Sequence, residues 1–286
     1  MNYQIKQLSS YAEQTLLHLT AGTVHSVYRH TINLTDGRHI LAMQADGSPL
    51  SPISLILELS GDNMDSLSVK AGDIVSFDRD GFWIQSAKSP CHFTCVNARR
   101  HELKLSASID SRSCRILASG IRDTVSVART DGFSLLFGQN KISESDLSPM
   151  LLAARDRILQ SNELCRQRDF AKAALHLSRL IGLGIGLTPS GDDFLCGVMA
   201  GLHFSGNLKH PFALSLQAEI GRRLSDTIDI SAAFLSCALD HQYSLPVKLL
   251  YELPSSWDIL TAFEQIGHSS GIDTLCGILW SLTHIL

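Results

Sequence analysis

One octapeptide pattern occurs twice in the chain, and the two copies stand 80 residues apart. Ser190 to Gly197 is SGDDFLCG and Ser270 to Gly277 is SGIDTLCG, so six of the eight positions are identical. After each copy, apolar residues continue at helical spacing. We therefore expect two similar helices that begin with the same turn, pack as neighbours and are related by a local twofold.

Each copy has the residues of a capping box. The hydroxyl of Ser190 or Ser270 can accept from the third helical N–H, and Asp193 or Asp273 can bond back to the serine amide. Gly191 at the first helical position lets another group approach the backbone donors. Ordinary helix capping is the alternative to a binding role.

The first copy follows a loop with little side-chain bulk, Gly182 to Pro189, which contains three glycines. Such a loop exposes backbone amides beside a helix N-terminus, where proteins commonly hold carboxylate or phosphate oxygens. We expect an anion or substrate site made of Gly184, Gly186, Thr188, Ser190, Gly191 and the second copy's Ser269 and Ser270.

Acidic residues at the same turns argue against a site for phosphate alone. Asp192, Asp193 and Asp273 would repel an anion unless a cation intervened. They suit a ligand with N–H donors, such as a ureido group, whose carboxylate the amides would bind. Mg²⁺ at Asp192 and Asp193 is the second possibility, since it prefers oxygen ligands. No other cofactor is expected.

His268 and Arg29 complete the candidate site. His268 lies two residues before Ser270, and its titration range suits proton transfer near neutral pH. We expect His268 and Asp193 to be catalytic, although a histidine in a turn is also often structural. Arg29 can anchor an anion from the first half of the chain, or it can be a solvated strand residue.

Several familiar sites are excluded by their missing residues. Gly186 is not followed by the Gly-Lys-Ser/Thr of a P-loop, and the glycine spacing is not that of a dinucleotide fingerprint after a strand. Ser190 is not in a G-x-S-x-G nucleophile elbow. Cys91 and Cys95 have no second pair at the spacing that structural zinc requires.

The first half of the chain has the pattern of short strands. Asp-Gly turns separate residues 26–34 from 39–44, and 74–77 from 82–85, as in tight hairpins. A further Asp131-Gly132 separates expected strands at 122–128 and 133–137. We expect an α+β protein whose residues 1–145 form a β-rich domain, either a sandwich or barrel-like.

The apolar period changes to about 3.6 residues after Ser148-Pro149, a serine cap followed by a proline suited to the first helical position. Residues 146–286 are expected to form an all-helical domain that carries the repeat. The expected helices are 169–181, 191–205, 212–225, 229–241, 257–266 and 271–285.

Composition narrows the classes of partner. Charged residues make up only 18% of the chain, the net charge is −4 and no lysine or arginine run occurs, so we expect neither nucleic acid nor a membrane surface as partner. The apolar stretches are too short to span a bilayer, and the N-terminus lacks a secretory pattern. We expect a cytoplasmic protein.

Residues 184–193 (GIGLTPSGDD) together with 267–277 (GHSSGIDTLCG) resemble the AllH family. The resemblance extends to residues 27–34 and 227–238. It implies a subunit of the oxamate carbamoyltransferase of anaerobic allantoin and purine breakdown, which converts oxalurate and phosphate into oxamate and carbamoyl phosphate, with other carbamoyltransferase subunits as partners.

The resemblance leaves alternatives open. The Ser-x-Arg-Thr-Arg phosphate motif of ordinary transcarbamoylases is missing, so the activity would use another scaffold. The chain can instead be a non-catalytic, anion-binding or scaffold subunit that completes a partner's active site, or a metal-dependent hydrolase using Asp192 and Asp193.

Overall fold

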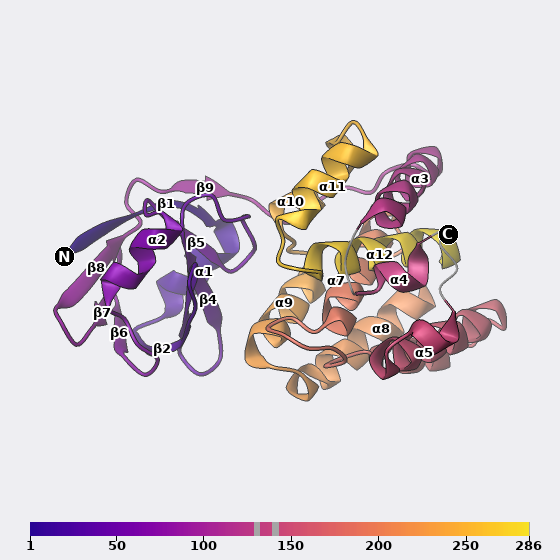
Figure 1. Cartoon of the computed structure of the whole chain (residues 1–286), viewed down its shortest axis with the longest axis horizontal. Coiled ribbons are helices and arrows are strands. Elements are labelled where there is room, and N and C mark those ends of the chain that lie inside the picture. The colour runs from indigo at the N-terminus through magenta and orange to yellow at the C-terminus, as the bar shows by residue number, and fades with distance from the viewer. Residues whose placement is uncertain (129–131, 139–142, 286) are drawn as a thin grey trace. The chain divides into compact units, whose positions relative to one another are not determined.

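The computed structural model describes residues 1–128, 132–138 and 143–285. The chain forms two compact units, Met1–Leu103 and Lys104–Leu286, and most of their helices and strands are labelled in Figure 1. The first unit is a β structure and the second is helical, which confirms the expected α+β class. The observed division after Leu103 comes earlier in the chain than the predicted division after residue 145.

The strands of the first unit form one sheet that closes on itself. In the sheet order β5-β4-β3-β2-β6-β7-β8-β1, β1 also pairs with β5, which makes an eight-stranded barrel within the described residues, with β9 paired to β1 outside this ring. Of the two expected arrangements of the β-rich domain, the barrel is confirmed and the sandwich is not. The elements are β1 (Asn2–Ser9), α1 (Ser10–His18), β2 (Ala21–Val27), β3 (Thr31–Thr35), β4 (Ile40–Gln44), β5 (Ser54–Leu57), α2 (Gly61–Met64), a 3-10 turn (Asp65–Leu67), β6 (Ile74–Phe77), β7 (Gly81–Gln85), β8 (Pro90–Thr94) and β9 (Arg99–His101).

The Asp-Gly hairpins of this unit are confirmed. β3 pairs antiparallel with β4, and β6 with β7; at the first turn Asp36 Oδ1 accepts from two backbone amides and Gly37 has a φ of 86°. The predicted single strand 26–34 is wrong, because the chain reverses between β2 and β3. Arg29 lies at this reversal and is exposed.

Apolar side chains from the barrel strands fill its interior. Ile5, Leu8, Val75, Phe82 and Phe93 are all fully buried, and the rings of Phe82 and Phe93 stack with centroids 5.1 Å apart. This unit therefore has a hydrophobic core of its own.

The second unit confirms the predicted helices to within a few residues. Ser148 caps the helix Pro149–Arg166 by accepting from the Leu151 amide, as the Ser148-Pro149 pattern predicted. The elements are α3 (Ser111–Val127), α4 (Ser134–Phe137), a 3-10 turn (Glu144–Asp146), α5 (Pro149–Arg166), α6 (Phe170–Ser178), α7 (Ser190–Phe204), α8 (Pro211–Arg222), a 3-10 turn (Leu224–Asp226), α9 (Asp229–Leu239), α10 (Leu245–Lys248), a 3-10 turn (Leu250–Glu252), α11 (Ser256–Glu264) and α12 (Ser270–His284).

The strands predicted at 122–128 and 133–137 are wrong, because both segments are helical. Asp110 caps α3 by accepting from two backbone amides, and Cys114, Leu117, Ile121 and Val125 are buried at helical spacing. Residues 133–137 overlap α4. Asp131, the first residue of the supposed turn, lies outside the described residues.

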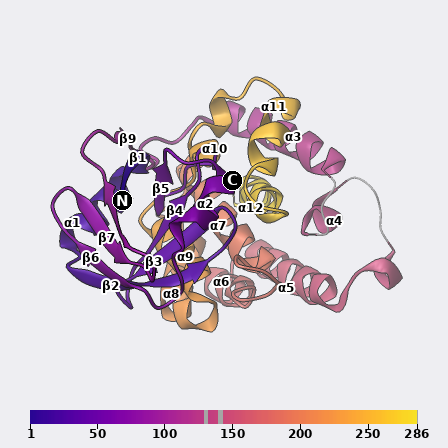
Figure 2. The ribbon, with the colours of Figure 1, turned by 60° about the vertical axis from the view of Figure 1, so that its left-hand side comes forward.

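Helices α7 and α12 form the centre of the helical unit (Figures 1 and 2). Most of their residues are buried, including Phe194 and Trp280. Trp280 Nε1 donates to Asn162 Oδ1 of α5 at 2.6 Å, so the polar atom of this core tryptophan has a partner. The two copies of the repeat therefore open the two most central helices.

Candidate functional site at the paired helix N-termini

Equivalent positions of the two copies face each other across α7 and α12. A side chain at Gly197 would overlap the carbonyl oxygen of Thr274 and lie 3.1 Å from Gly277 Cα. A side chain at Gly277 would overlap the carbonyl oxygen of Phe194. Because positions 80 residues apart meet, the helices are neighbours in the arrangement that a local twofold produces, as predicted.

The predicted capping boxes are wrong in one respect, because the serines and aspartates pair between the copies. The N-caps are Pro189 and Ser269, and neither side chain makes a cap hydrogen bond within the described residues. The hydroxyls of Ser270 and Ser190 instead hydrogen-bond to the carboxyl groups of Asp193 and Asp273, respectively. Ser190 and Ser270 are first helical residues, so each side chain is available to the neighbouring helix.

The Asp193 and Asp273 carboxyl groups are buried together. Burial is the main cause that raises the pKa of Asp193 well above its usual range, and the negative charge of Asp273 adds to this rise. Burial also raises the pKa of Asp273, to about 6, against the hydrogen bonds from the Phe133 amide, Ser190 and Ser269. Two close buried carboxyl groups cannot both ionise at low cost.

One oxygen of each carboxyl group has no hydrogen-bond partner among the described residues. These atoms are Asp193 Oδ2 and Asp273 Oδ2, and both are buried. Buried polar atoms in folded proteins are nearly always hydrogen-bonded, so an unpartnered oxygen needs an explanation such as a bound group or a shared proton. A shared proton or a bound donor would supply the missing partner of each oxygen.

Asp273 is attached to a segment that precedes α4. Its Oδ1 accepts from the Phe133 amide at 2.6 Å, and a side chain at Gly132 would overlap the same carboxyl group. The Phe133 ring packs on Phe194 of α7, with centroids 5.2 Å apart. Asp273 is thus held from a third element and is fully buried.

Asp192 lies next to Asp193 in the sequence, but its interactions are with other elements. Its Oδ1 accepts from the Gly182 amide at 2.9 Å, and its Oδ2 accepts from the hydroxyls of Thr227 and Ser231 at 2.5 and 2.7 Å. These bonds fasten the glycine loop and α9 to α7. Within the described ranges no cluster of three His, Cys, Asp or Glu could hold a metal, and magnesium at Asp192 and Asp193 stays a prediction.

The glycine loop, residues 182–189, has three glycines with positive φ angles. Gly182, Gly184 and Gly186 have φ values of 73°, 142° and 99°, where a side chain would be strained. Among the described residues, the amides of 184–188 donate to no backbone carbonyl, and Ile185 is 93% exposed. These amides remain available to an anion.

Gly191 has a packing role that differs from the predicted one. A side chain there would overlap the Leu180 carbonyl oxygen, and its amide donates to the Leu183 carbonyl at 2.9 Å. Gly271 repeats this arrangement: its amide donates to the Ile266 carbonyl at 3.1 Å. The glycine of each copy lets the preceding chain pack against the helix start.

A pair of hydroxyl groups joins the loop to the second copy. Thr188 Oγ1 and Ser270 Oγ lie 2.7 Å apart, and both hydroxyls hydrogen-bond toward Asp193. His268 is exposed and follows Gly267, whose φ is 65°. The structure thus brings together Thr188, Ser190, Asp193, Ser269, Ser270 and Asp273, while Arg29 belongs to the other unit.

Two family models match this chain. The model described as oxamate carbamoyltransferase subunit AllH matches residues 180–282, and the model of the AllH family N-terminal domain matches residues 3–100. The chain belongs to the AllH family. Family membership makes it a carbamoyltransferase subunit, and other subunits of the complex are its partners. No solved structure matches the chain.

The matched ranges of the AllH models follow the architecture. The first range begins just before the glycine loop and ends within α12, so it contains both copies of the repeat. The second range nearly coincides with the barrel unit. No helix in the described part of the chain has the length and apolarity needed to cross a membrane.

Several residues that surround the two copies of the repeat were not predicted. Phe133 was assigned to a strand of the other domain, and Thr227 and Ser231 carry no motif that would connect them with Asp192. Gly182 was part of the predicted loop, but its amide was not assigned to Asp192. The apolar residues of 111–127 recur at helical spacing when the whole segment is considered. This spacing was the one signal that would have placed the following Phe133 in the helical unit.

Proposed function

We propose that this AllH-family chain carries part of the active site that converts oxalurate and phosphate into oxamate and carbamoyl phosphate, in the allantoin and purine breakdown pathway. The observation that carries the proposal is the Asp193–Asp273 pair, buried where two helix N-termini meet. One oxygen of each carboxyl group has no partner in the part of the chain that the structure describes. The expected location is the cytoplasm.

The reaction needs a proton donor for a poor leaving group. A phosphate oxygen attacks the ureido carbonyl carbon, the bond from that carbon to the amide nitrogen breaks, and the nitrogen leaves as oxamate once it receives a proton. A carboxyl group that stays protonated near neutral pH is suited to this step. Burial and the charge of Asp273 favour the protonated form of Asp193.

The other groups at the site have complementary roles in this proposal. The amides of the glycine loop and the hydroxyl of Thr188 bind the oxygens of phosphate or of the oxalurate carboxylate. Ionised Asp273 accepts from a ureido N–H. His268, exposed before α12, removes the proton that phosphate loses when its oxygen attacks.

A reconstituted complex of the full-length chain with its partner subunits tests the proposal. We expect Asp193→Asn to lower kcat for carbamoyl phosphate formation by about 100-fold or more, because general acid catalysis commonly contributes this much. KM should change little. Asp156→Asn is the matched control, since Asp156 is an exposed acid of α5 whose one hydrogen bond among the described residues comes from Gln160. Unchanged kcat in the Asp193 variant would refute the catalytic role.

The second candidate function is that of a scaffold or small-anion-binding subunit without catalytic groups. Asp273 is fully buried and held by the Phe133 amide, and Asp192 has hydrogen bonds to both of its oxygens, as expected of structural groups. In that case the isolated chain would bind phosphate or oxalurate in a calorimetric titration, while Asp193→Asn and His268→Ala would leave kcat of the complex unchanged.

A further inference from the structure

A groove of about 790 Å³ lies in the helical unit, between α3 and the chain that runs from the 3-10 turn at 250–252 into α11. None of the residues that form the proposed catalytic site lines it. Its lining includes Asp110, Ile116, Leu117 and Asp123 of the α3 side and Tyr251 and Ile259 of the other side.

We call this groove the α3–α11 groove. Its two walls are in contact at its base. Thr124 Oγ1 of α3 donates to the Ser256 carbonyl at 3.0 Å. A side-chain carbon at Gly120 would lie 3.6 Å from Ile259 Cδ1, at ordinary van der Waals distance, so α3 and α11 are close to each other at this point. Because the walls are joined, the groove exists before any partner binds.

Large apolar side chains are exposed along the groove. Ile116 is 64% exposed and Tyr251 is 56% exposed, and Trp257, which follows the lining residue Ser256, is 72% exposed. Single apolar residues on a surface are ordinary, but a set gathered around one concave surface marks an interaction site. Aromatic residues are enriched in the interfaces of protein complexes.

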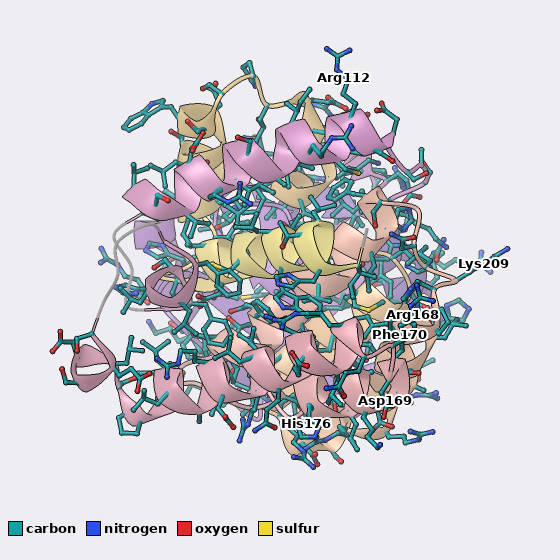
Figure 3. The ribbon with its side chains drawn as sticks, turned by 90° about the vertical axis from the view of Figure 1, so that its right-hand side faces the viewer. Arg112, Arg168, Asp169, Phe170, His176 and Lys209 are labelled. Atoms are coloured by element: carbon teal, nitrogen blue, oxygen red, sulfur yellow. The ribbon has the colours of Figure 1, made fainter. Side chains whose placement is uncertain are left out.

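The charge of the α3–α11 groove is negative. Asp110 and Asp123 line it and are exposed, and the described lining residues include no lysine or arginine. On the other wall, residues 250–259 contain no lysine or arginine. Figure 3 shows Arg112 extending outward from α3, and it is not a lining residue.

This charge and shape identify the kind of occupant. Phosphate and oxalurate are anions, and the carboxylates of Asp110 and Asp123 would repel them. The lining positions of α3 from Ser113 to Asp123 follow one face of the helix over about 15 Å, which matches about three turns of a second helix. Helices with an apolar face bind such grooves through residues spaced three or four apart.

We propose that the α3–α11 groove binds an amphipathic helical segment of another subunit of the transferase. Apolar side chains of that segment contact Ile116, Leu117 and Ile259, and its lysines or arginines lie opposite Asp110 and Asp123. The proposal rests on the chain's place in a multi-subunit transferase and not on the chemistry of Asp193.

Binding of the purified partner subunits to the full-length chain tests the proposal. We expect Ile116→Asp to weaken the Kd at least 10-fold, because it places a carboxylate at an apolar interface. Asp123→Lys should weaken the Kd several-fold. Raised salt should weaken binding of the wild-type chain, since charge attraction is screened.

The matched control is Leu159→Asp, because Leu159 is 53% exposed on α5 and lies outside the groove lining. Its Kd should equal that of the wild type, and circular dichroism should show the same helix content in all variants. Equal Kd values for wild type, Ile116→Asp and Asp123→Lys would overturn the proposal. Self-association of the wild-type chain that Ile116→Asp abolishes would also overturn it, because a second copy would then occupy the groove.

Failure of this proposal can be separated from failure of the catalytic one. At saturating partner concentrations Ile116→Asp should recover the wild-type kcat, while Asp193→Asn should bind the partners with wild-type Kd and stay inactive. An Asp193 variant that loses partner binding would place the paired helix N-termini, and not the groove, at the subunit interface.

Discussion

The two copies of the repeat have nearly the same sequence but different surroundings. In the first copy, Asp192 binds the glycine loop and α9. The second copy has Ile272 at the equivalent position, which is buried as an apolar residue. The carboxyl group of Asp193 is hydrogen-bonded by the hydroxyls of Ser270 and Thr188, whereas that of Asp273 also accepts a hydrogen bond from the Phe133 amide.

This difference makes two identical residues chemically unequal. A backbone amide that donates to a carboxylate favours its ionised form, so Asp273 is the better candidate for the charged member of the pair. Asp193 has the greater tendency to keep a proton. The duplicated motif therefore places two aspartates in equivalent positions, and the segments around them give their carboxyl groups different hydrogen bonds and different tendencies to ionise.

The largest expected effect tests the close contact between α7 and α12, in which equivalent positions of the two copies meet. Gly277→Ala and Gly197→Ala should each lower the free energy of unfolding by about 3 kcal/mol, because the added carbon overlaps a backbone carbonyl of the other helix. Urea unfolding of the full chain measures this. Gly221→Ala in α8 is the control, since the described residues leave open space there, and it should be neutral or stabilising. A mild effect at Gly277 would mean that the helices can separate.

The pH dependence of stability tests the buried pair. The folded pKa values of Asp193 and Asp273 are raised above the usual value of 3.8, the latter to about 6. The native state therefore binds more protons than the unfolded chain. The stabilisation that Asp273 contributes is complete below pH 3.8 and is lost as pH rises through about 6. We expect the unfolding free energy to fall by about 2 kcal/mol over that range.

The measurement is a series of urea unfolding curves between pH 4.5 and pH 7.5. Replacing both residues, as Asp193→Asn with Asp273→Asn, should remove most of this pH dependence. The matched control is Asp156→Asn, because Asp156 is an exposed acid on α5, and it should keep the slope of the wild type. A steep slope that survives in the double variant would show that other groups titrate.

Much of the fold could be predicted because its signals are local. Asp-Gly turns gave the β3–β4 and β6–β7 hairpins, and the 3.6-residue period gave α7 and α12. Helix α3 was missed because Thr124, Val125 and Val127 have strand propensity and alternate with polar residues over a short window. Its buried stripe appears only over the whole helix, and this error moved the predicted domain boundary to residue 145.

The candidate site was predictable as far as the repeat extends. Two identical turns on neighbouring helices imply that Ser190, Asp193, Ser270 and Asp273 meet, and they do. The exchange of partners between copies was not predictable, because it depends on which residue is the N-cap. The contact between Phe133 and Asp273 joins residues 140 positions apart, and such pairing leaves no local pattern.

The smallest expected effect compares two adjacent aspartates of the first copy. Asp192→Asn should lower the free energy of unfolding by about 1 kcal/mol, because an amide cannot accept all three of the hydrogen bonds that the carboxylate accepts. Asp193→Asn should leave stability unchanged or raise it, because it removes the cost of keeping a buried carboxyl group protonated at a pH at which the unfolded chain ionises it. Unfolding curves at pH 7.5 measure both.

Opposite signs at neighbouring positions would separate the two roles physically. A group kept for stability should cost stability when it is replaced, whereas a group kept for chemistry often relieves strain or charge repulsion when it is removed. If Asp193→Asn instead destabilises the chain as much as Asp192→Asn does, the carboxyl pair is a structural lock between α7 and α12. The asymmetry between the two copies would then have no catalytic meaning.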